Sequence, residues 1–451
     1  MLELKEIMDG KIINGKEDIE IAGFNISNNR HFKNEFYIPI FWREDRHKYI
    51  IDAVRKGASG YMISSSYEKF QEIINESKKI NPNITIYKVE DVNETLLKMA
   101  EYNRKKHIDI PIIAVTGSVG KTTTTYMINT IINQEKKSLS DSQNNNTKIL
   151  LSLLLLDLDD YDIATLEVGI ARKNTMEPIS KLLQPSIVVI NNIGTAHIGN
   201  IGSKEEILKE KLLLTKYIKD EKVVFLNGDD KLLSNVEDNK YKIIRFSTKE
   251  AFNVKHEDGK IIFEMNVYNE NTQFCLNSYC EHDISNAVCA IRVCEFLKIS
   301  KDNIVKGIKE YKNVNRRFNV IKREYTVIDD TYNASLASMK SGLISASNMK
   351  NYKRKIAVLG DMLELGEYSE KLHTEVGNVF KNLKFDLLFT QGENTKYICK
   401  QAEKFMDKKN VRHFDNQENL IKELLSEVRE GDLIYLKASK KMQFNKIVEK
   451  L

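Results

Sequence analysis

A single stretch of the sequence, HIDIPIIAVTGSVGKTTTTYM (residues 107–127), decides the fold of this chain. The apolar, β-branched run before Gly117 is typical of a buried parallel strand. A short turn that contains Gly117 and Gly120 follows it, and the pattern predicts a helix that starts near Lys121. A strand that leads through a glycine turn into a helix predicts an α/β domain built on a parallel sheet.

The same stretch has the residues of a phosphate-binding loop. Gly117 and Gly120 allow the backbone to turn its N–H groups toward phosphate oxygens, and Lys121 adds a positive charge at the β/γ end. The Thr122 hydroxyl can bind Mg²⁺. The longer form of the motif has glycine at position 115, where this chain has Val115, so the match is to the shorter TGxxGKT variant. A chance Gly-Lys turn is the alternative, but the order of strand, loop and helix favours a site for an ATP-type nucleotide.

The sequence on both sides of this stretch also alternates between strands and helices. Buried strands are predicted after it at DIATLEVG (162–169), PSIVVINNIG (185–194) and KVVFLNGDD (222–230), followed by mixed β sequence at 243–276 and a helix at about 284–297. The alternation restarts after Arg317, with strands at YTVIDD (325–330), KIAVLGDM (355–362), FDLLFTQG (385–392) and DLIYLKAS (432–439). The first 100 residues predict strands at IEIAGF (19–24), FYIPIFW (36–42) and GYMIS (60–64), with helices at 50–56 and 93–106. We therefore predict an α/β chain with domains at residues 1–108, 109–315 and 316–451.

Composition excludes several classes of protein. The chain has 451 residues, 69 Lys+Arg against 64 Asp+Glu, and a formal net charge of +5. This small excess predicts no nucleic-acid or membrane partner, and a charged fraction of 29% with both signs argues against disorder. Five cysteines without a Cys-x-x-Cys pair fit the reduced thiols of a cytosolic protein. The charged start and the short apolar run at 149–158 predict neither a signal peptide nor a membrane span. We expect a cytoplasmic monomer.

Two side chains after the loop are candidate metal ligands. Glu167 ends the predicted strand IATLE, and His197 follows another strand end after a glycine-containing turn. Each alone is more often a solvated or hydrogen-bonding residue, but both are predicted at the sheet edge that carries the phosphate loop. Because a bound triphosphate needs Mg²⁺ and Mg²⁺ is bound by few carboxylates, we expect a metal site here. The acidic run at 157–162 is interpreted as a solvated loop.

At these residues the chain resembles the Mur ligases, the ATP-dependent amino-acid-adding enzymes of peptidoglycan synthesis. The resemblance extends over nearly the whole chain and rests on several separated motifs. These are TGSVGKTT (116–123), Asn145-Asn146, Glu167-Val-Gly169, NNIGTAH (191–197), Gly202-Ser203, NGDD (227–230), HDISN (282–286), Arg317-Phe318, DDTYNA (329–334), LGDMLELG (359–366) with His373, and LKAS (436–439). The DDTYNA and LGDMLELG stretches resemble the branch of the family that adds D-Ala-D-Ala to UDP-MurNAc-tripeptide.

The resemblance implies an N-terminal UDP-substrate-binding domain, a central ATP-binding domain and a C-terminal Rossmann-like domain that binds the incoming dipeptide. ATP and Mg²⁺ are the implied cofactors, and UDP-MurNAc-tripeptide and D-Ala-D-Ala are the implied substrates. The implied catalytic residues are Lys121, Lys211 and His197. The implied ATP-binding residues are Gly117, Ser118, Gly120, Lys121, Thr122, Thr123, Asn286, Arg317 and Asp330. The implied metal ligands are Thr122, Glu167, His197 and Lys211. The implied substrate-binding residues are Ser27, Arg30, Asn145, Asn146, Asn333, Asp361, Lys437 and Ser439.

The resemblance also implies a chemistry in which ATP converts a carboxylate into an acyl phosphate that the incoming amine attacks. Catalysis is then positioning and charge neutralisation, which suits a sequence that offers no serine or cysteine nucleophile. Lys211 matches a family lysine that is carbamylated, and Asn286 would face the adenine. The alternative for Lys211 is a surface lysine in the Lys-rich segment KEEILKEKLLLTK (204–216).

Several positions depart from the family pattern. Ser27–Arg30 stands where the family has Asp-Ser-Arg, and Asp45-Arg-His47 stands for Asp-Gly-His. Leu213 replaces an acidic residue, and Cys280 and Ala438 replace glycines. These departures leave open a Mur-like ligase with a different amino-acid or dipeptide acceptor. A catalytically inactive nucleotide-binding scaffold is the second alternative, and the retained lysines, threonine, glutamate and histidine of the predicted site argue against it.

Overall fold

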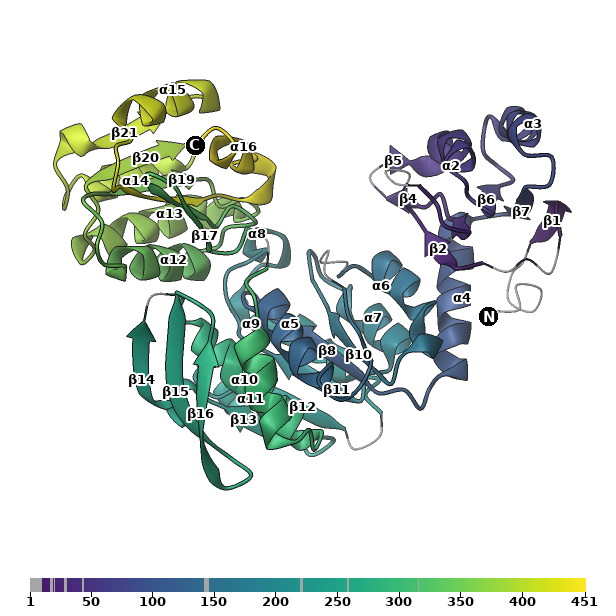
Figure 1. Ribbon diagram of the computed structural model, residues 1–451, viewed down its shortest axis with the longest axis horizontal. Coiled ribbons are helices and arrows are strands. Elements are labelled where there is room, and N and C mark those ends of the chain that lie inside the picture. The colour runs from purple at the N-terminus through teal and green to yellow at the C-terminus, as the bar shows by residue number, and fades with distance from the viewer. Residues whose placement is uncertain are drawn as a thin grey trace. The chain divides into compact units, whose positions relative to one another are not determined.

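The computed structural model describes residues 10–16, 19, 21–27, 31–42, 44–141, 146–219, 222–257, 259–314 and 316–451. It divides into two compact units, whose elements are labelled in Figure 1. The first unit contains the chain up to Pro111 with Asn145–Ala164 and Lys181–Leu183, and the second contains Ile112–Asn144, Thr165–Ser180 and Gln184–Leu451. Among the described residues, no helix is long and apolar enough to cross a membrane.

A five-stranded sheet with the order β1-β7-β6-β3-β2 is the centre of the first unit. β1 pairs antiparallel with β7, and the remaining pairs are parallel. The predicted strand GYMIS is β6 and is buried at every position. The strands are β1 (Lys11–Asn14), β2 (Gly23–Asn25), β3 (Glu35–Tyr37), β4 (Phe41–Trp42), β5 (Glu44–Asp45), β6 (Gly60–Ser64) and β7 (Thr85–Val89). The helices are α2 (Ile50–Arg55), α3 (Phe70–Ile80), α4 (Val92–Lys106) and α6 (Lys148–Leu155).

The prediction of one strand at FYIPIFW is wrong. β3 ends at Tyr37, and β4 is a separate two-residue strand that pairs antiparallel with β5. Pro39 lies in the interruption, where it has no N–H to donate to a ladder. The predicted strand at 19–24 is also displaced, since β2 covers Gly23–Asn25.

The phosphate-loop stretch lies in the six-stranded sheet β13-β12-β11-β8-β10-β9. The pairs β13–β12, β12–β11 and β11–β8 are parallel, so their carboxyl ends lie at one edge. The predicted helix near Lys121 is α5, and the predicted helix at 284–297 is α10. The strands are β8 (Ile112–Thr116), β9 (Ser138–Leu139), β10 (Ile163–Glu167), β11 (Ile187–Ile190), β12 (Val223–Asn227) and β13 (Lys242–Phe246). The helices are α5 (Lys121–Ile132), α7 (Met176–Leu183), α8 (Ile198–Ile201), α9 (Lys204–Leu212), α10 (Asp283–Phe296) and α11 (Lys301–Glu310).

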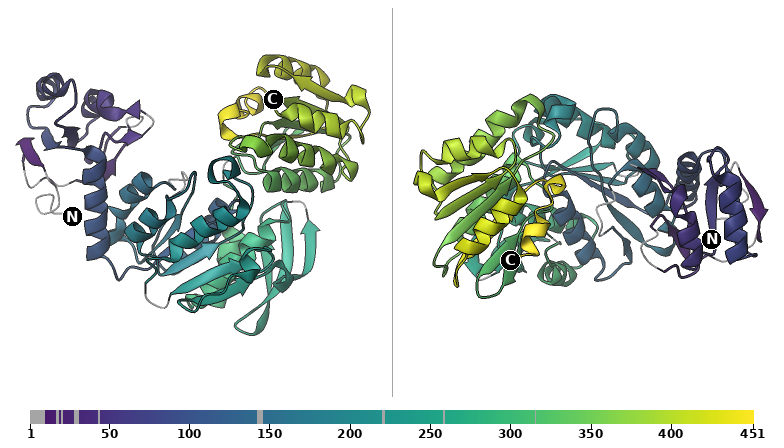
Figure 2. Two further views of the ribbon diagram at one scale, coloured as in Figure 1. Left: turned by 180° about the vertical axis from the view of Figure 1, so that it is seen from behind. Right: turned by 90° about the horizontal axis from the view of Figure 1, so that it is seen from above.

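The mixed β sequence at 243–276 begins within β13 of the central sheet, and from residue 252 onward it forms a separate antiparallel sheet. Figure 2 shows its three strands next to α10 and α11, against which β15 and β16 pack. The apolar residues of β15 alternate with polar ones, and Ile261, Phe263 and Met265 are fully buried. Alternation therefore places one face of this sheet on the helices. The strands are β14 (Phe252–Glu257), β15 (Lys260–Val267) and β16 (Glu270–Leu276).

The C-terminal part of the second unit contains a six-stranded sheet with the order β17-β18-β22-β19-β20-β21. It is parallel except for the edge strand β17. Helices lie on both faces, with α15 and α16 on one and α12, α13 and α14 on the other (Figure 1). The strands are β17 (Asn319–Lys322), β18 (Thr326–Asp329), β19 (Lys355–Gly360), β20 (Leu387–Gln391), β21 (Val411–Phe414) and β22 (Leu433–Lys437). The helices are α12 (Leu336–Asn348), α13 (Ser369–Gly377), α14 (Thr395–Ala402), α15 (Gln417–Glu427) and α16 (Asn445–Val448).

Candidate active site

The phosphate-loop motif forms a tight turn between β8 and α5. Gly120 is the N-cap residue of α5 and has a left-handed φ of 81°. A Cβ at this position would lie 2.4 Å from Asn286 Oδ1. Only glycine fits here, because the backbone is unfavourable for other residues and the space is filled. The turn presents the first N–H groups of α5 at the helix N-terminus, which is the geometry that binds phosphate.

Asn192, which follows the end of the neighbouring strand β11, holds the loop. Its Oδ1 accepts hydrogen bonds from Ser118 N at 3.1 Å and Val119 N at 2.9 Å, and its Nδ2 donates to Val119 O at 3.0 Å. Ser118 Oγ in turn accepts from Gly194 N at 2.7 Å. This supporting role was missed from the sequence, although the parallel strand ends placed NNIG beside the loop.

Thr122, Glu167 and Arg317 meet beside the loop. Thr122 Oγ1 donates to Glu167 Oε2 and accepts from Arg317 Nη2 at 2.8 Å. The guanidinium carbon of Arg317 lies 4.1 Å from the centroid of the Tyr332 ring. The structure therefore brings a predicted metal-binding pair together with a predicted ATP-binding arginine 195 positions further along the chain.

Lys121 and Lys211 lie close to each other behind the loop. Lys121 Nζ donates to Gly117 O at 3.0 Å, and Lys211 Nζ donates to Thr116 Oγ1 at 3.4 Å. Lys211 is only 1% exposed, so its interpretation as a surface lysine is wrong. Loss of solvation lowers the pKa of Lys211 well below its ordinary value, the Lys121 charge lowers it further, and Glu167 opposes both. Burial also lowers the pKa of Lys121.

His197 lies at the start of α8 and contacts a loop of the C-terminal sheet. Its Nδ1 forms a hydrogen bond with Glu364 Oε2, and Gly199 N donates to Glu364 O at 3.1 Å. Burial lowers the pKa of His197, the Glu364 carboxylate raises it, and the charges of Lys121 and Lys211 lower it again. Glu364 lies in the LGDMLELG stretch, but its pairing with His197 was not predicted.

Asn286 is part of a buried polar network rather than an isolated side chain. Its Oδ1 accepts from Thr124 Oγ1 at 3.1 Å, and its Nδ2 donates to Asp283 Oδ1 at 2.9 Å. Asn191 Nδ2 donates to Thr124 Oγ1 at 2.8 Å. The network links the first turns of α5 and α10 to the end of β11, which fixes the orientation of the Asn286 amide.

The predicted residues of the C-terminal sheet are largely engaged within the protein. Lys437 Nζ donates to Asp330 Oδ2 at 2.7 Å, and Tyr435 donates to the same oxygen at 2.9 Å. Asp361 Oδ1 accepts the backbone N–H groups of residues 394 and 395, at the start of α14, at 3.0 and 2.9 Å. Ser439 Oγ accepts from the N–H of residue 363 at 2.9 Å. Asn333 is exposed.

The predicted substrate residues of the first part of the chain are only partly described. Arg30 and Asn145 lie outside the described residues, Ser27 N donates to Asn25 Oδ1 at 2.8 Å, and Asn146 is partly buried. In the first unit, a cavity of about 310 Å³ is lined by Phe41, Asp45, His47, Ser64, Ser66, Tyr67, Glu68, Asp91, Val92 and Asn93. The rings of His47 and Tyr67 stack with centroids 4.7 Å apart.

The residues at the edge of the central sheet fit a nucleotide triphosphate with Mg²⁺. The α5 N-terminus, Lys121 and Arg317 supply positive potential for phosphate oxygens. The hydroxyl of Thr122 and the carboxylate of Glu167 are the hard oxygen ligands that Mg²⁺ prefers. Asn191 Oδ1 is buried beside the loop with no hydrogen-bond partner among the described residues.

The phosphate loop, the buried lysines and the parallel sheet define a P-loop enzyme that uses a nucleotide. Comparison of the sequence with known protein families identifies the class of enzyme more closely. Residues 115–294 match the Mur ligase middle domain, and residues 316–440 match the family described as Mur ligase, glutamate ligase domain. The chain belongs to the Mur ligase family and is an ATP-dependent ligase.

Relatives match along nearly the whole chain. The UDP-N-acetylmuramoyl-tripeptide–D-alanyl-D-alanine ligase of Bacillus subtilis is 29% identical and covers 99% of this chain and 97% of that protein. The ligase of the same name from Synechocystis is 27% identical, with coverage of 98% and 94%.

Solved structures share the fold. MurF from Acinetobacter baumannii has a TM-score of 0.83 and 22% identity, and covers 100% of this chain and 97% of that one. MurF ligase from Thermotoga maritima in complex with ADP has a TM-score of 0.74 and 23% identity, with coverage of 95% and 96%. At these identities the structural likeness shows the fold, which is the predicted α/β Mur ligase fold.

Proposed function

We propose that this ligase joins D-Ala-D-Ala to UDP-MurNAc-tripeptide while it cleaves ATP to ADP and phosphate, in peptidoglycan precursor synthesis. The observation that carries the proposal is the Bacillus subtilis relative of that name, which aligns over 99% of this chain. The retained lysines, threonine and glutamate at the edge of the central sheet support it, because they argue against an inactive scaffold. We also propose that the protein acts as a cytoplasmic monomer without a nucleic-acid or membrane partner.

ATP would be held by the α5 N-terminus and its neighbours, where its γ-phosphoryl group turns the tripeptide carboxylate into an acyl phosphate. The residues proposed to bind it are Gly117, Ser118, Gly120, Lys121, Thr122, Thr123, Asn286, Arg317 and Asp330. The proposed Mg²⁺ ligands are Thr122, Glu167, His197 and Lys211. For Asp330 the role is indirect, because its carboxylate is already bound by Lys437 and Tyr435.

Lys121 and Arg317 neutralise the negative charge that develops on the transferred group. Both lie within hydrogen-bond distance of the loop or of α5, at Gly117 O and Thr122 Oγ1 respectively. Hydrogen-bond donors that are already in position need no reorganisation during the reaction. This preorganisation is the main source of the rate enhancement in such a site.

Lys211 would act as a carbamate. A carbamate forms when a neutral amine attacks CO₂ and releases a proton, and the burial of Lys211 favours the neutral amine. The product is an anion, which replaces an unfavourable second positive charge beside Lys121 with a favourable negative one. His197 is positioned by Glu364 at the same edge.

The nucleotide-linked tripeptide and the dipeptide would bind other parts of the chain. We propose that the uridine end of the substrate binds the first unit at the 310 Å³ cavity, where the stacked His47 and Tyr67 rings offer a flat surface. Ser27, Arg30, Asn145 and Asn146 would contact the rest of this substrate. The exposed side chain of Asn333 would contact the dipeptide. Asp361, Lys437 and Ser439 would hold the loops at the edge of the C-terminal sheet in shape for this substrate. The domains would be residues 1–108, 109–315 and 316–451.

The test is phosphate release with ATP, Mg²⁺, UDP-MurNAc-tripeptide and a panel of D,D-dipeptides. We expect release that depends on both substrates and is fastest with D-Ala-D-Ala, with formation of the pentapeptide product by mass spectrometry. Release with another amine but with no dipeptide would replace the proposal with a ligase for a different acceptor. No release with any amine, together with intact ATP binding, would indicate the scaffold.

A further inference from the structure

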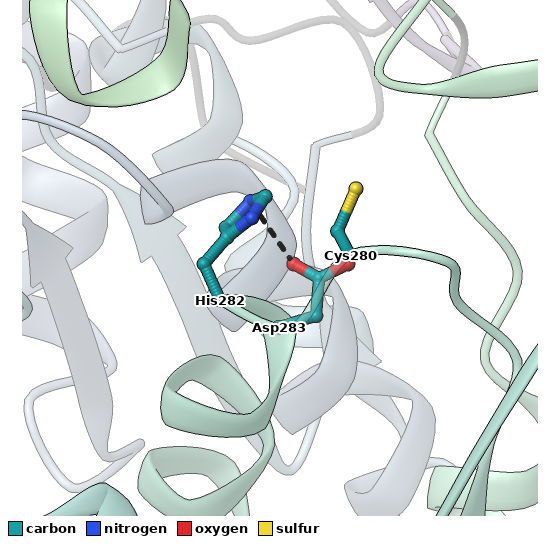
Figure 3. A group of neighbouring side chains, drawn as sticks. All are labelled: Cys280, His282 and Asp283. Carbon is teal, nitrogen blue, oxygen red and sulfur yellow. Dashed lines mark ion pairs between the residues drawn. The ribbon is translucent and has the colours of Figure 1, made fainter. Parts of the chain in front are cut away.

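We propose that Cys280, His282 and Asp283 form a zinc-binding site next to the network that holds Asn286, whose Nδ2 donates to Asp283 Oδ1 at 2.9 Å. The three residues lie within four positions of the chain, at the N-terminus of α10, and Figure 3 shows their side chains gathered around the Asp283 carboxylate. Among the described residues, this is the group of cysteine, histidine and acidic side chains whose geometry could hold a metal ion.

The spacing of the donor atoms is close to that of a metal site. One sulfur, one ring nitrogen and one carboxylate oxygen all lie within 4.8 Å of one another. Metal–ligand bonds of about 2.0–2.3 Å at tetrahedral angles place ligand atoms roughly 3.3–3.6 Å apart. His282 Nε2 already lies 3.5 Å from Asp283 Oδ1. A contraction of about 1 Å at the thiol would complete the three-ligand set, with water at the fourth position.

Neighbouring side chains orient the ligands as metal sites require. Ser341 Oγ is 2.7 Å from His282 Nδ1, which leaves Nε2 on the side of Asp283. Ser278 Oγ donates to Asp283 Oδ2 at 2.6 Å and accepts from Cys280 N at 3.0 Å. Such partners fix the ring and the carboxylate of a metal ligand before the ion arrives.

A cavity lies next to this group. It has a volume of about 680 Å³, and Ser278, Glu281 and Ser345 are among its lining residues. Ser345 is also a hydrogen-bond partner of the Cys280 thiol. The imidazole of His282 is 45% exposed, so an ion can reach it directly.

The mixture of ligands selects the metal. Thiolate, imidazole and carboxylate together bind Zn²⁺ well, whereas Mg²⁺ requires oxygen ligands and keeps its waters. One thiolate and one carboxylate balance the two charges of the ion. Zn²⁺ binds the thiolate, so the proton of the Cys280 thiol is released on binding.

The test uses Co²⁺ as a spectroscopic probe of the full-length protein. We expect a thiolate-to-Co²⁺ absorption band in the near ultraviolet at one equivalent, which Zn²⁺ abolishes and excess Mg²⁺ does not. Cys280→Ser should remove the band. Cys289→Ser is the matched control, because Cys289 is a buried cysteine of α10 that lies outside the group, and the band should remain. Ser278→Ala should weaken Co²⁺ binding about 10–100-fold.

Absence of the band in the wild-type protein, or its persistence in Cys280→Ser, would overturn the proposal. Should Cys280→Ser unfold, His282→Ala decides, because the exposed ring can be removed without damage to the core. Unchanged Co²⁺ affinity in a folded His282→Ala variant would then exclude the site.

Discussion

The edge of the central sheet and the edge of the C-terminal sheet both carry predicted functional residues, but these residues have different surroundings. At the central edge, Lys121, Thr122 and Glu167 surround a turn that fits phosphate. At the C-terminal edge, Asp330 and Lys437 bind each other and are buried. The comparison teaches that residues of similar chemistry at similar strand ends can serve either a ligand or the fold, and that the glycine turn at the N-terminus of α5 marks the central edge as the ligand site.

The largest expected effect is the loss of Lys121. Lys121→Ala removes a positioned positive charge beside the transferred phosphoryl group, so phosphate release should fall at least about 10²–10³-fold. Thermal stability should change little, because the lysine is not a structural partner of a buried carboxylate. Turnover close to that of the wild type would refute the role of Lys121.

The next effect concerns Lys211 and CO₂. Lys211→Ala should reduce turnover, and enzyme depleted of CO₂ should lose activity that bicarbonate restores. The depressed pKa of Lys211 keeps its amine neutral at lower pH than an exposed lysine, so restoration should already occur near neutral pH. Lys209→Ala is the matched control, since this lysine of α9 is 74% exposed, and it should retain full activity. Bicarbonate-independent activity would contradict a carbamate.

At the C-terminal edge the main effect should be on stability. Lys437→Met leaves the Asp330 carboxylate without its cation, and removal of one partner of a buried pair costs about 3–5 kcal/mol. Hydrogen exchange of the β18 and β22 amides measures this loss of free energy locally. The double variant Asp330→Leu/Lys437→Met should recover part of it. Unchanged exchange of these amides in Lys437→Met would show that the pair is not structural.

The smallest effect is expected at Asp361, which accepts the first N–H groups of α14. Asp361→Ala should cost about 1 kcal/mol, the usual value of a helix N-cap. Asp407→Ala provides the comparison, because Asp407 accepts the N–H of Lys409 at 3.2 Å on the exposed surface and should cost less. A large loss of turnover with unchanged stability in Asp361→Ala would instead show that Asp361 acts in ligand binding.

The sequence predicted the parts of the molecule that local patterns determine. The glycine turn at 117–120 and the buried strands around it were confirmed, because β-branched runs and a positive φ leave clear local signals. The Asn192 support and the Glu364 partner of His197 were not predicted. Their hydrogen bonds span about 70 and 170 positions respectively, so they depend on tertiary packing that no local pattern encodes. Pro39 could have warned against a continuous strand at FYIPIFW.

His197 and Glu364 share one further property: both adopt left-handed backbone, with φ of 61° and 64°. For residues with a Cβ this conformation costs about 1–2 kcal/mol each relative to ordinary helical backbone. Glycine at either position would relieve that strain, but it also raises the entropy of the unfolded chain and removes the imidazole or the carboxylate. Relief of backbone strain alone would therefore favour a change that abolishes this contact, and sequence libraries intended to preserve activity should keep both positions fixed.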